Sequence, residues 1–264
     1  MTDTAWRTIS GRLGWFIAAT FVVAMAAFAL RQFHVIVPEP EFPPPDATLV
    51  DNLIRSFEHE QAHWIGDLVS SLTLAAGFVG LAILGTTLRR ALDRDDAGGA
   101  VLAVIFLLGG AIGAASQVLY LGAIEVATNP GYCDCGFLAE EIISRGMARD
   151  IVNNVVFWMT DASVVLFTIG LWVFAALAPA SGWVPNGLTM YARVVAVVAF
   201  LSVLWGRVAV PLLIAGRAEL DFELIGGVLT LLVAGVLVPI WAAWLALSAR
   251  AAAPELEETL SAGD

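Results

Sequence analysis

The chain has few charged residues, no lysine, and few cysteines or histidines. Together these shortages exclude several classes of protein. Charged residues make up 14% of its 264 residues, whereas a soluble domain carries about 25%. With 59% hydrophobic residues, this composition excludes an ordinary cytosolic enzyme, a disordered chain and a secreted disulfide scaffold. All 13 basic residues are arginine, the net charge is -11 and no basic patch exists, so no nucleic-acid partner is predicted. Two cysteines and three histidines argue against a multi-haem or iron–sulfur protein.

Six long apolar runs dominate what is present. Each contains the ~20 residues that a helix needs to cross ~30 Å of hydrocarbon, whereas a β-barrel would show ~10-residue alternating segments. The first run exceeds the ~7–15 apolar residues of a signal peptide, so we interpret it as an uncleaved helix. The sequence predicts an all-α integral membrane protein in contact with the lipid bilayer, with one domain over 1–264 and a bundle of six transmembrane helices. The spans lie at roughly 13–37, 64–88, 99–124, 151–178, 188–215 and 222–247.

The arginines orient the predicted bundle. With the N-terminus in the cytoplasm, seven arginines lie on or near the inner side and five on the outer side. Both termini are then cytoplasmic, as expected in the inner membrane of a bacterium or archaeon. Two outer loops, 38–63 and 125–150, are candidate surfaces for a protein partner. A short amphipathic helix is predicted over 47–63, before the second span, and an acidic tail over 250–264.

The sharpest motif is His59-Glu60-Gln61-Ala62-His63. Two histidines four residues apart share a helical face and can bind one metal ion, while the intervening glutamate can act as general base on a metal-bound water. The segment resembles the HExxH signature of zinc peptidases, which implies zinc on His59 and His63 and catalysis by Glu60.

The histidine pair continues into the second span as a stripe of small and polar residues, which we expect to face the bundle. An exposed helix whose histidines meet water and lipid headgroups is the alternative. The stripe comprises Asn52, His59, His63, Gly66, Ser70 and Gly77.

A zinc site needs a third protein ligand, and outer acids are the candidates. Glu140 and Glu141 stand out because Glu140-Glu141-Ile142-Ile143-Ser144-Arg145-Gly146 resembles the EExxxRG motif of the CPBP family of intramembrane proteases. The glutamates of that family help to activate water. Its members also carry histidines on later helices, whereas no histidine follows His63 here. The alternative is an amphipathic helix with an internal Glu141–Arg145 pair at i,i+4.

Two charges fall within predicted spans, where an ionisable residue is costly unless it is paired. Asp161 and Arg207 lie about 17 and 19 residues from the inner ends of the fourth and fifth spans, so their depths agree to ~3 Å. The short inner loop makes these spans antiparallel neighbours. The sequence therefore predicts an Asp161–Arg207 ion pair.

Two weaker metal hypotheses involve residues of the outer side. His34 could ligate a haem together with His59 or His63. Cys133 and Cys135 are too close in sequence for an unstrained disulfide, and two thiolates alone make a sparse metal site. We assign the cysteines no role.

The sequence leads to one functional hypothesis and two alternatives. The first is a zinc-dependent membrane hydrolase of peptide or lipid, with the outer ionisable cluster as its site. The second is a non-enzymatic transporter or accessory subunit whose cluster binds a cation or a proton. The third is a structural membrane protein whose outer loops bind a partner.

Overall fold

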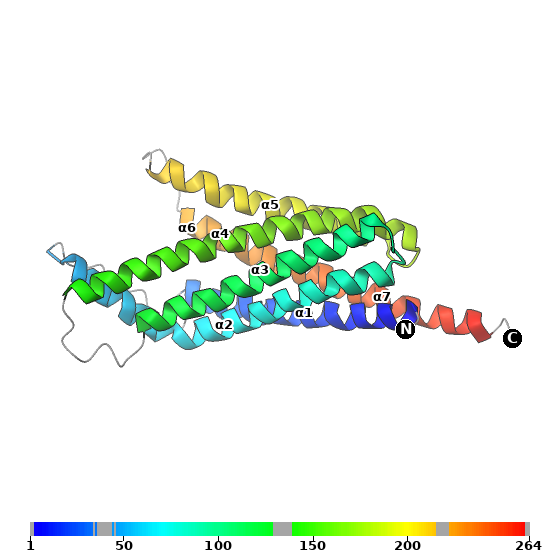
Figure 1. The fold of residues 1–264 in the computed structure, drawn as a ribbon, viewed down its shortest axis with the longest axis horizontal. Helices are drawn as coiled ribbons and strands as arrows, with labels where there is room; N and C mark the ends of the chain where they lie inside the picture. Colours follow the sequence, from blue (N-terminus) through cyan, green and yellow to red (C-terminus); the bar gives the residue numbers. More distant parts are fainter. Residues whose placement is uncertain are drawn as a thin grey trace.

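The computed structural model describes residues 3–33, 35, 44, 46–128, 139–214 and 222–261. Within these residues every secondary-structure element is a helix, and six helical segments are long and apolar enough to cross a membrane. The predicted all-α bundle of six apolar helices is confirmed. The start of the first helix and the end of the last lie at the same end of the bundle (Figure 1). We call the opposite end the distal end.

The sixth span is built from three helical pieces in succession, and the other five spans are single long helices. Consecutive long helices pack on one another, and the last returns to pack on the first. The elements are α1 (Asp3–Gln32), α2 (Leu49–Ala91), α3 (Ala97–Thr128), α4 (Ala139–Leu177), a short 3-10 helix η2 (Ala178–Ser181), α5 (Asn186–Ile214), α6 (Phe222–Thr230), a π-helix η3 (Leu231–Leu237) and α7 (Val238–Ser261).

Three segments that the sequence analysis placed outside the spans belong to long helices. Residues 49–63 are the first turns of α2 and not a separate short helix, and residues 139–150, predicted as loop, begin α4. Residues 250–261, predicted as tail, continue α7. The reason is that no proline and almost no glycine interrupts the first two segments, and the third is rich in alanine, leucine and glutamate, which favour helix.

A capping box fixes the start of α2. The Thr48 hydroxyl accepts a hydrogen bond from the Asp51 N–H at 3.2 Å, and the Asp51 carboxylate accepts one from the Thr48 N–H at 2.9 Å. These two bonds satisfy N–H groups that a helix start otherwise leaves unpaired. α2 is therefore one continuous rod from Leu49, and it carries the histidine motif on the same rod as the second span.

Small residues allow close helix contacts. A Cβ placed on Gly110 of α3 would lie 2.4 Å from the Phe78 carbonyl oxygen of α2, so only glycine fits at this crossing. A Cβ on Gly14 of α1 would lie 2.5 Å from the Ala242 carbonyl oxygen of α7. Such contacts let packing hold helices together where lipid provides no hydrophobic drive.

The short connection between α2 and α3 pairs its arginines with its own acids. Arg90 lies 2.9 Å from Asp95, and Arg94 lies 2.7 Å from Asp96. Asp96 also accepts a hydrogen bond from the Gly99 N–H at 2.9 Å, and this bond holds the pKa of the Asp96 carboxyl below its usual value. The arginines that orient the chain in the sequence analysis are therefore partly neutralised.

Candidate functional site

Polar side chains from four helices meet near the distal end, and we call them the distal polar cluster. They come from the last turn of α1, the first half of α2, the end of α3 and the start of α4. The members are Arg31, Ser56, His59, Glu60, His63, Asp67, Tyr120 and Arg149.

One face of α2 carries three members of this cluster. Glu60, His63 and Asp67 follow one another at i, i+3 and i+7, which places them above one another on one face. His63 is 6% exposed and Asp67 is 4% exposed, so both point into the bundle. The His59 and His63 rings meet edge to face, with centroids 4.6 Å apart.

The predicted inward stripe is wrong in part. His63 and Gly77 are buried as expected, but Asn52 is exposed, and a Cβ on Gly66 would meet nothing within 4 Å. The inward face of α2 includes Asp67, whose carboxylate has a partner on the neighbouring helix.

Arg31 of α1 is that partner. Its guanidinium forms an ion pair with Asp67 and donates a hydrogen bond to the Tyr120 hydroxyl of α3 at 2.7 Å. Its side chain is 28% exposed, whereas the Asp67 side chain is 5% exposed. Arg31 therefore links three helices and supplies the charge that offsets a buried carboxylate.

Arg149 of α4 makes the second link. Its guanidinium lies 3.1 Å from the Glu60 carboxylate and donates a hydrogen bond to the Ser56 hydroxyl at 2.9 Å. It also lies over the Phe57 ring, 5.2 Å from the centroid. The Arg149 and Glu60 side chains are 11% and 18% exposed, so this pair is largely shielded from water.

The charges in this cluster balance, but two of its carboxylate oxygens have no hydrogen-bond partner among the described residues. Arg31 offsets Asp67 and Arg149 offsets Glu60, which leaves no net negative charge among these four groups. Within the described part of the chain, one oxygen of each carboxylate, Oε2 of Glu60 and Oδ2 of Asp67, is buried without a hydrogen-bond partner. A buried carboxylate oxygen without a partner is costly and is able to accept a proton.

The structure does not bring the predicted third zinc ligands to the histidines. Glu140 and Glu141 are exposed in the first turn of α4, and Glu141 pairs with Arg145 at 3.3 Å. Glu141 lies about 12 Å along the helix from Arg149, which is the residue of α4 that reaches Glu60. Over the described residues, no group of three or more His, Cys, Asp or Glu is arranged to hold a metal ion.

Asp161 of α4 and Arg207 of α5 form the ion pair that the sequence analysis predicts. The Arg207 guanidinium stacks on two rings of α4, 3.3 Å from the Trp158 centroid and 4.4 Å from the Phe157 centroid. Asp161 lines a partly open cavity of about 550 Å³ between helices of the bundle. The second polar site of the chain therefore lies beside an apolar space.

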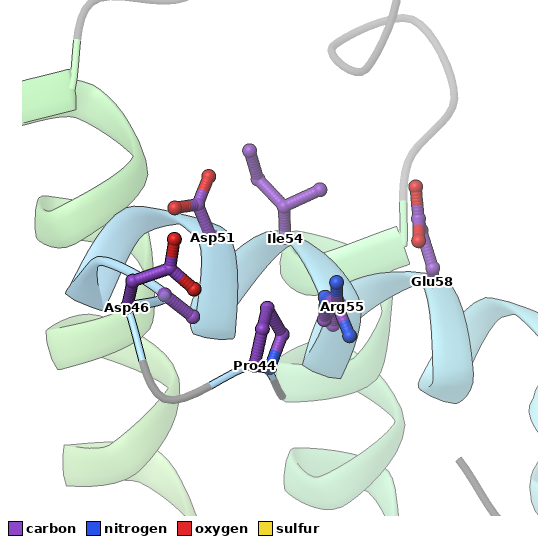
Figure 2. Close-up of a pocket in the computed structure, with 7 residues that line it drawn as sticks. Pro44, Asp46, Asp51, Ile54, Arg55 and Glu58 are labelled. Atoms are coloured by element: carbon purple, nitrogen blue, oxygen red, sulfur yellow. The ribbon is translucent and has the colours of Figure 1, made fainter. Parts of the chain in front are cut away.

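A shallower hollow of about 380 Å³ lies over the first turns of α2, lined by Asp46, Asp51, Ile54, Arg55 and Glu58 (Figure 2). Its residues are mostly exposed, and the Asp51 carboxylate is already used to cap α2. The hollow is a consequence of the helix start and its flanking acids.

Sequence reasoning missed five members of the distal polar cluster: Arg31, Ser56, Asp67, Tyr120 and Arg149. Arg31 and Asp67 could have been paired by the depth comparison that was applied to Asp161 and Arg207. The remaining candidates His34, Cys133 and Cys135 lie outside the described residues. No family model, curated protein or solved structure matches the chain.

Proposed function

We propose that this chain is a non-enzymatic integral membrane protein, a transporter or an accessory subunit, whose distal polar cluster takes up a proton. The observation that carries the proposal is the pair of buried carboxylates on α2. Each is held by an arginine through one oxygen, while the other oxygen is buried without a partner. Ionisable side chains inside a membrane helix are costly, and in most membrane proteins they have a functional role.

The charge balance favours a proton over a metal cation. Two arginines already neutralise Glu60 and Asp67. A divalent ion would add two positive charges to a largely buried site, whereas one proton adds a single charge and forms a hydrogen bond. His59 and His63 lie on the same face of α2, and the imidazole is the side chain that exchanges protons near neutral pH.

The zinc hydrolase is a weaker candidate on the same geometry. Its proposed general base, Glu60, is held by Arg149 at 3.1 Å, so one of its carboxylate oxygens is already engaged and is not free to accept a proton from a metal-bound water. Its proposed third ligands, Glu140 and Glu141, lie in the first turn of α4, before the residue of α4 that reaches Glu60. Zinc binding by His59 and His63 stays a prediction that metal analysis can test.

For orientation we propose cytoplasmic termini in the inner membrane of a bacterium or archaeon. The arginine bias supports this arrangement, and the start of α1 and the end of α7 share one end of the bundle (Figure 1). The distal polar cluster then opens toward the outer face.

Infrared difference spectroscopy on the purified full-length chain in nanodiscs tests the proton site. Acidification is expected to produce the band of a protonated carboxylic acid that exchanges slowly with deuterium. Asp67→Asn or Glu60→Gln should remove this band. Glu58→Gln, an exposed acid on the same helix, is the matched control and should leave it unchanged. A band that persists in both cluster variants would refute the proposal.

Two further measurements separate the alternatives. Proteoliposomes loaded with a pH-sensitive dye should acidify faster with the wild-type chain than with Asp67→Asn if the protein is a transporter, and equally fast if it is an accessory subunit. Stoichiometric zinc that is lost in His63→Ala would favour the hydrolase instead.

A further inference from the structure

The cavity inside the bundle has the size and the lining of a ligand site. Its volume of about 550 Å³ lies within the ~300–1,000 Å³ of typical small-molecule pockets. Its walls come from α1, α2, α4, α5 and the sixth span, and they are mostly apolar, with Phe21, Phe78 and Phe167 among them.

The sixth span keeps this space open. Gly226 and Gly227 of α6 line the cavity, and a Cβ on Gly226 would meet nothing within 4 Å. The π-helix η3 follows and contributes Val233 and Ala234 to the wall. π-helical turns are rare and concentrate at functional sites.

The oxygen-bearing side chains of the lining are Thr160, Asp161, Ser202 and Thr230. The three hydroxyl groups already donate their hydrogens within the protein. Ser202 donates to the Ala199 carbonyl at 2.7 Å, Thr230 to the Gly226 carbonyl at 3.0 Å, and Thr160 to the Ser116 hydroxyl at 3.3 Å. What these four side chains offer to a guest molecule is therefore acceptor oxygens.

The polar wall also has no net charge. Arg207 offsets Asp161, and the rings of Phe157 and Trp158 hold its guanidinium. A charged head group would enter an apolar space without a free counter-charge, at a high desolvation cost. The four oxygen-bearing side chains therefore favour a head group that is uncharged and donates a hydrogen bond, and the lining adds one indole, that of Trp205.

We propose that this cavity binds an uncharged lipid-like molecule with an apolar body and a hydroxyl head that donates a hydrogen bond to this wall. An isoprenoid alcohol, a quinol and a diacylglycerol share this chemistry. The inference is independent of proton uptake by the distal polar cluster, and either can fail without the other.

Partition of labelled probes between protein-containing and protein-free nanodiscs tests the site. Phytol is expected to be enriched by the full-length chain. Its methyl ether, which lacks the donor, should bind roughly tenfold more weakly, and the hydrocarbon phytane more weakly still. Equal retention of the three probes, or no enrichment of phytol, would overturn the proposal.

Two glycine variants locate the binding. Gly226→Leu should fill the cavity and abolish the enrichment of phytol. Gly122→Leu, at a helical glycine that also has open space but does not line the cavity, should leave it unchanged. Ser202→Ala removes one acceptor without adding bulk and should weaken binding several-fold. Wild-type retention of phytol in both Gly226→Leu and Ser202→Ala would refute this location.

Analysis of lipids that co-purify with the wild-type chain and with Gly226→Leu identifies the source of the ligand. A diacylglycerol or an isoprenoid alcohol that is enriched only in the wild type supports the site and names the natural occupant. Charged phospholipids that are displaced by Gly226→Leu would contradict the uncharged head group.

Discussion

Replacement of Arg31 by glutamine is expected to destabilise the chain more than its position near a helix end suggests. The variant leaves the Asp67 carboxylate, 5% exposed, without its ion-pair partner, and it removes the hydrogen bond to Tyr120. Breaking one side of a buried ion pair costs about 3–5 kcal/mol, because a buried charge is left uncompensated.

The double variant Arg31→Gln/Asp67→Asn should recover most of this loss. Both charges are then absent, and replacing a whole buried pair is often close to neutral. We expect a net cost of about 1–2 kcal/mol, chiefly from the lost hydrogen bond to Tyr120. Asp67→Asn alone should cost less than Arg31→Gln, because the Arg31 side chain is 28% exposed and can reach water.

Unfolding free energies of the four proteins in one detergent system close the thermodynamic cycle. The sum of the two single losses in unfolding free energy should exceed the loss in the double variant by well over ~0.5 kcal/mol. Effects of independent sites usually add within that limit. Additive losses within that limit would show that Arg31 and Asp67 do not act as a pair, and the electrostatic account of the distal polar cluster would be wrong.

Three further changes probe other parts of the structure, each by thermal unfolding in detergent. Gly110→Leu should destabilise by at least about 1–3 kcal/mol through overpacking between α2 and α3, whereas Gly122→Leu, with open space, should have little effect. Arg149→Gln removes the partner of the largely buried Glu60 carboxylate and should cost several kcal/mol. Arg90→Gln, in an exposed pair with Asp95, should cost about 0.5 kcal/mol or less. Equal effects of the two variants would contradict the burial argument. Trp241→Ala should cost about 3–5 kcal/mol, because this ring is 0% exposed and packs against three phenylalanines; a small loss would mean that the core collapses around it.

The spans could be predicted from sequence because each apolar run exceeds the thickness of the hydrocarbon. The helix bounds were less accessible, since hydropathy ends at the membrane surface while the helix does not. For α2, the residues that form the capping box, Thr48 and Asp51, were a readable signal for a start at Leu49. Local capping chemistry, and not hydropathy, sets that bound.

A comparison of how deep charged residues lie along the predicted spans identifies some of the ion pairs and misses others. Asp161 and Arg207 could be matched because their spans are joined by a short loop and both fall deep within the predicted spans. Arg31 was assigned to the outer side as an orienting charge, so its match in depth with Asp67 was missed. Arg149 could not be paired in this way, because residues 139–150 lie outside the apolar runs and are predicted as loop.

The cavity could not be predicted from sequence at all. Its walls come from five parts of the bundle, and they include Val233 and Ala234 of the π-helix η3. Pro239 lacks the N–H that would bond four residues back, and the Val238 N–H bonds instead to the Val233 carbonyl, five residues back. A pattern of apolar residues carries no record of such a shift in backbone register.

The length of α2 and α4 has a mechanical consequence. Their 43 and 39 residues correspond to about 64 and 58 Å, roughly twice the ~30 Å of hydrocarbon that they cross. At the distal end the two helices touch where Leu53 meets Gly146, and the Glu60–Arg149 pair joins them about two turns further along α2 and one turn further along α4. A partner protein that binds the ends of α2 and α4 beyond the hydrocarbon would be able to tilt both helices. Such a tilt would strain first the Glu60–Arg149 pair and then the wall of the cavity that contains Asp161.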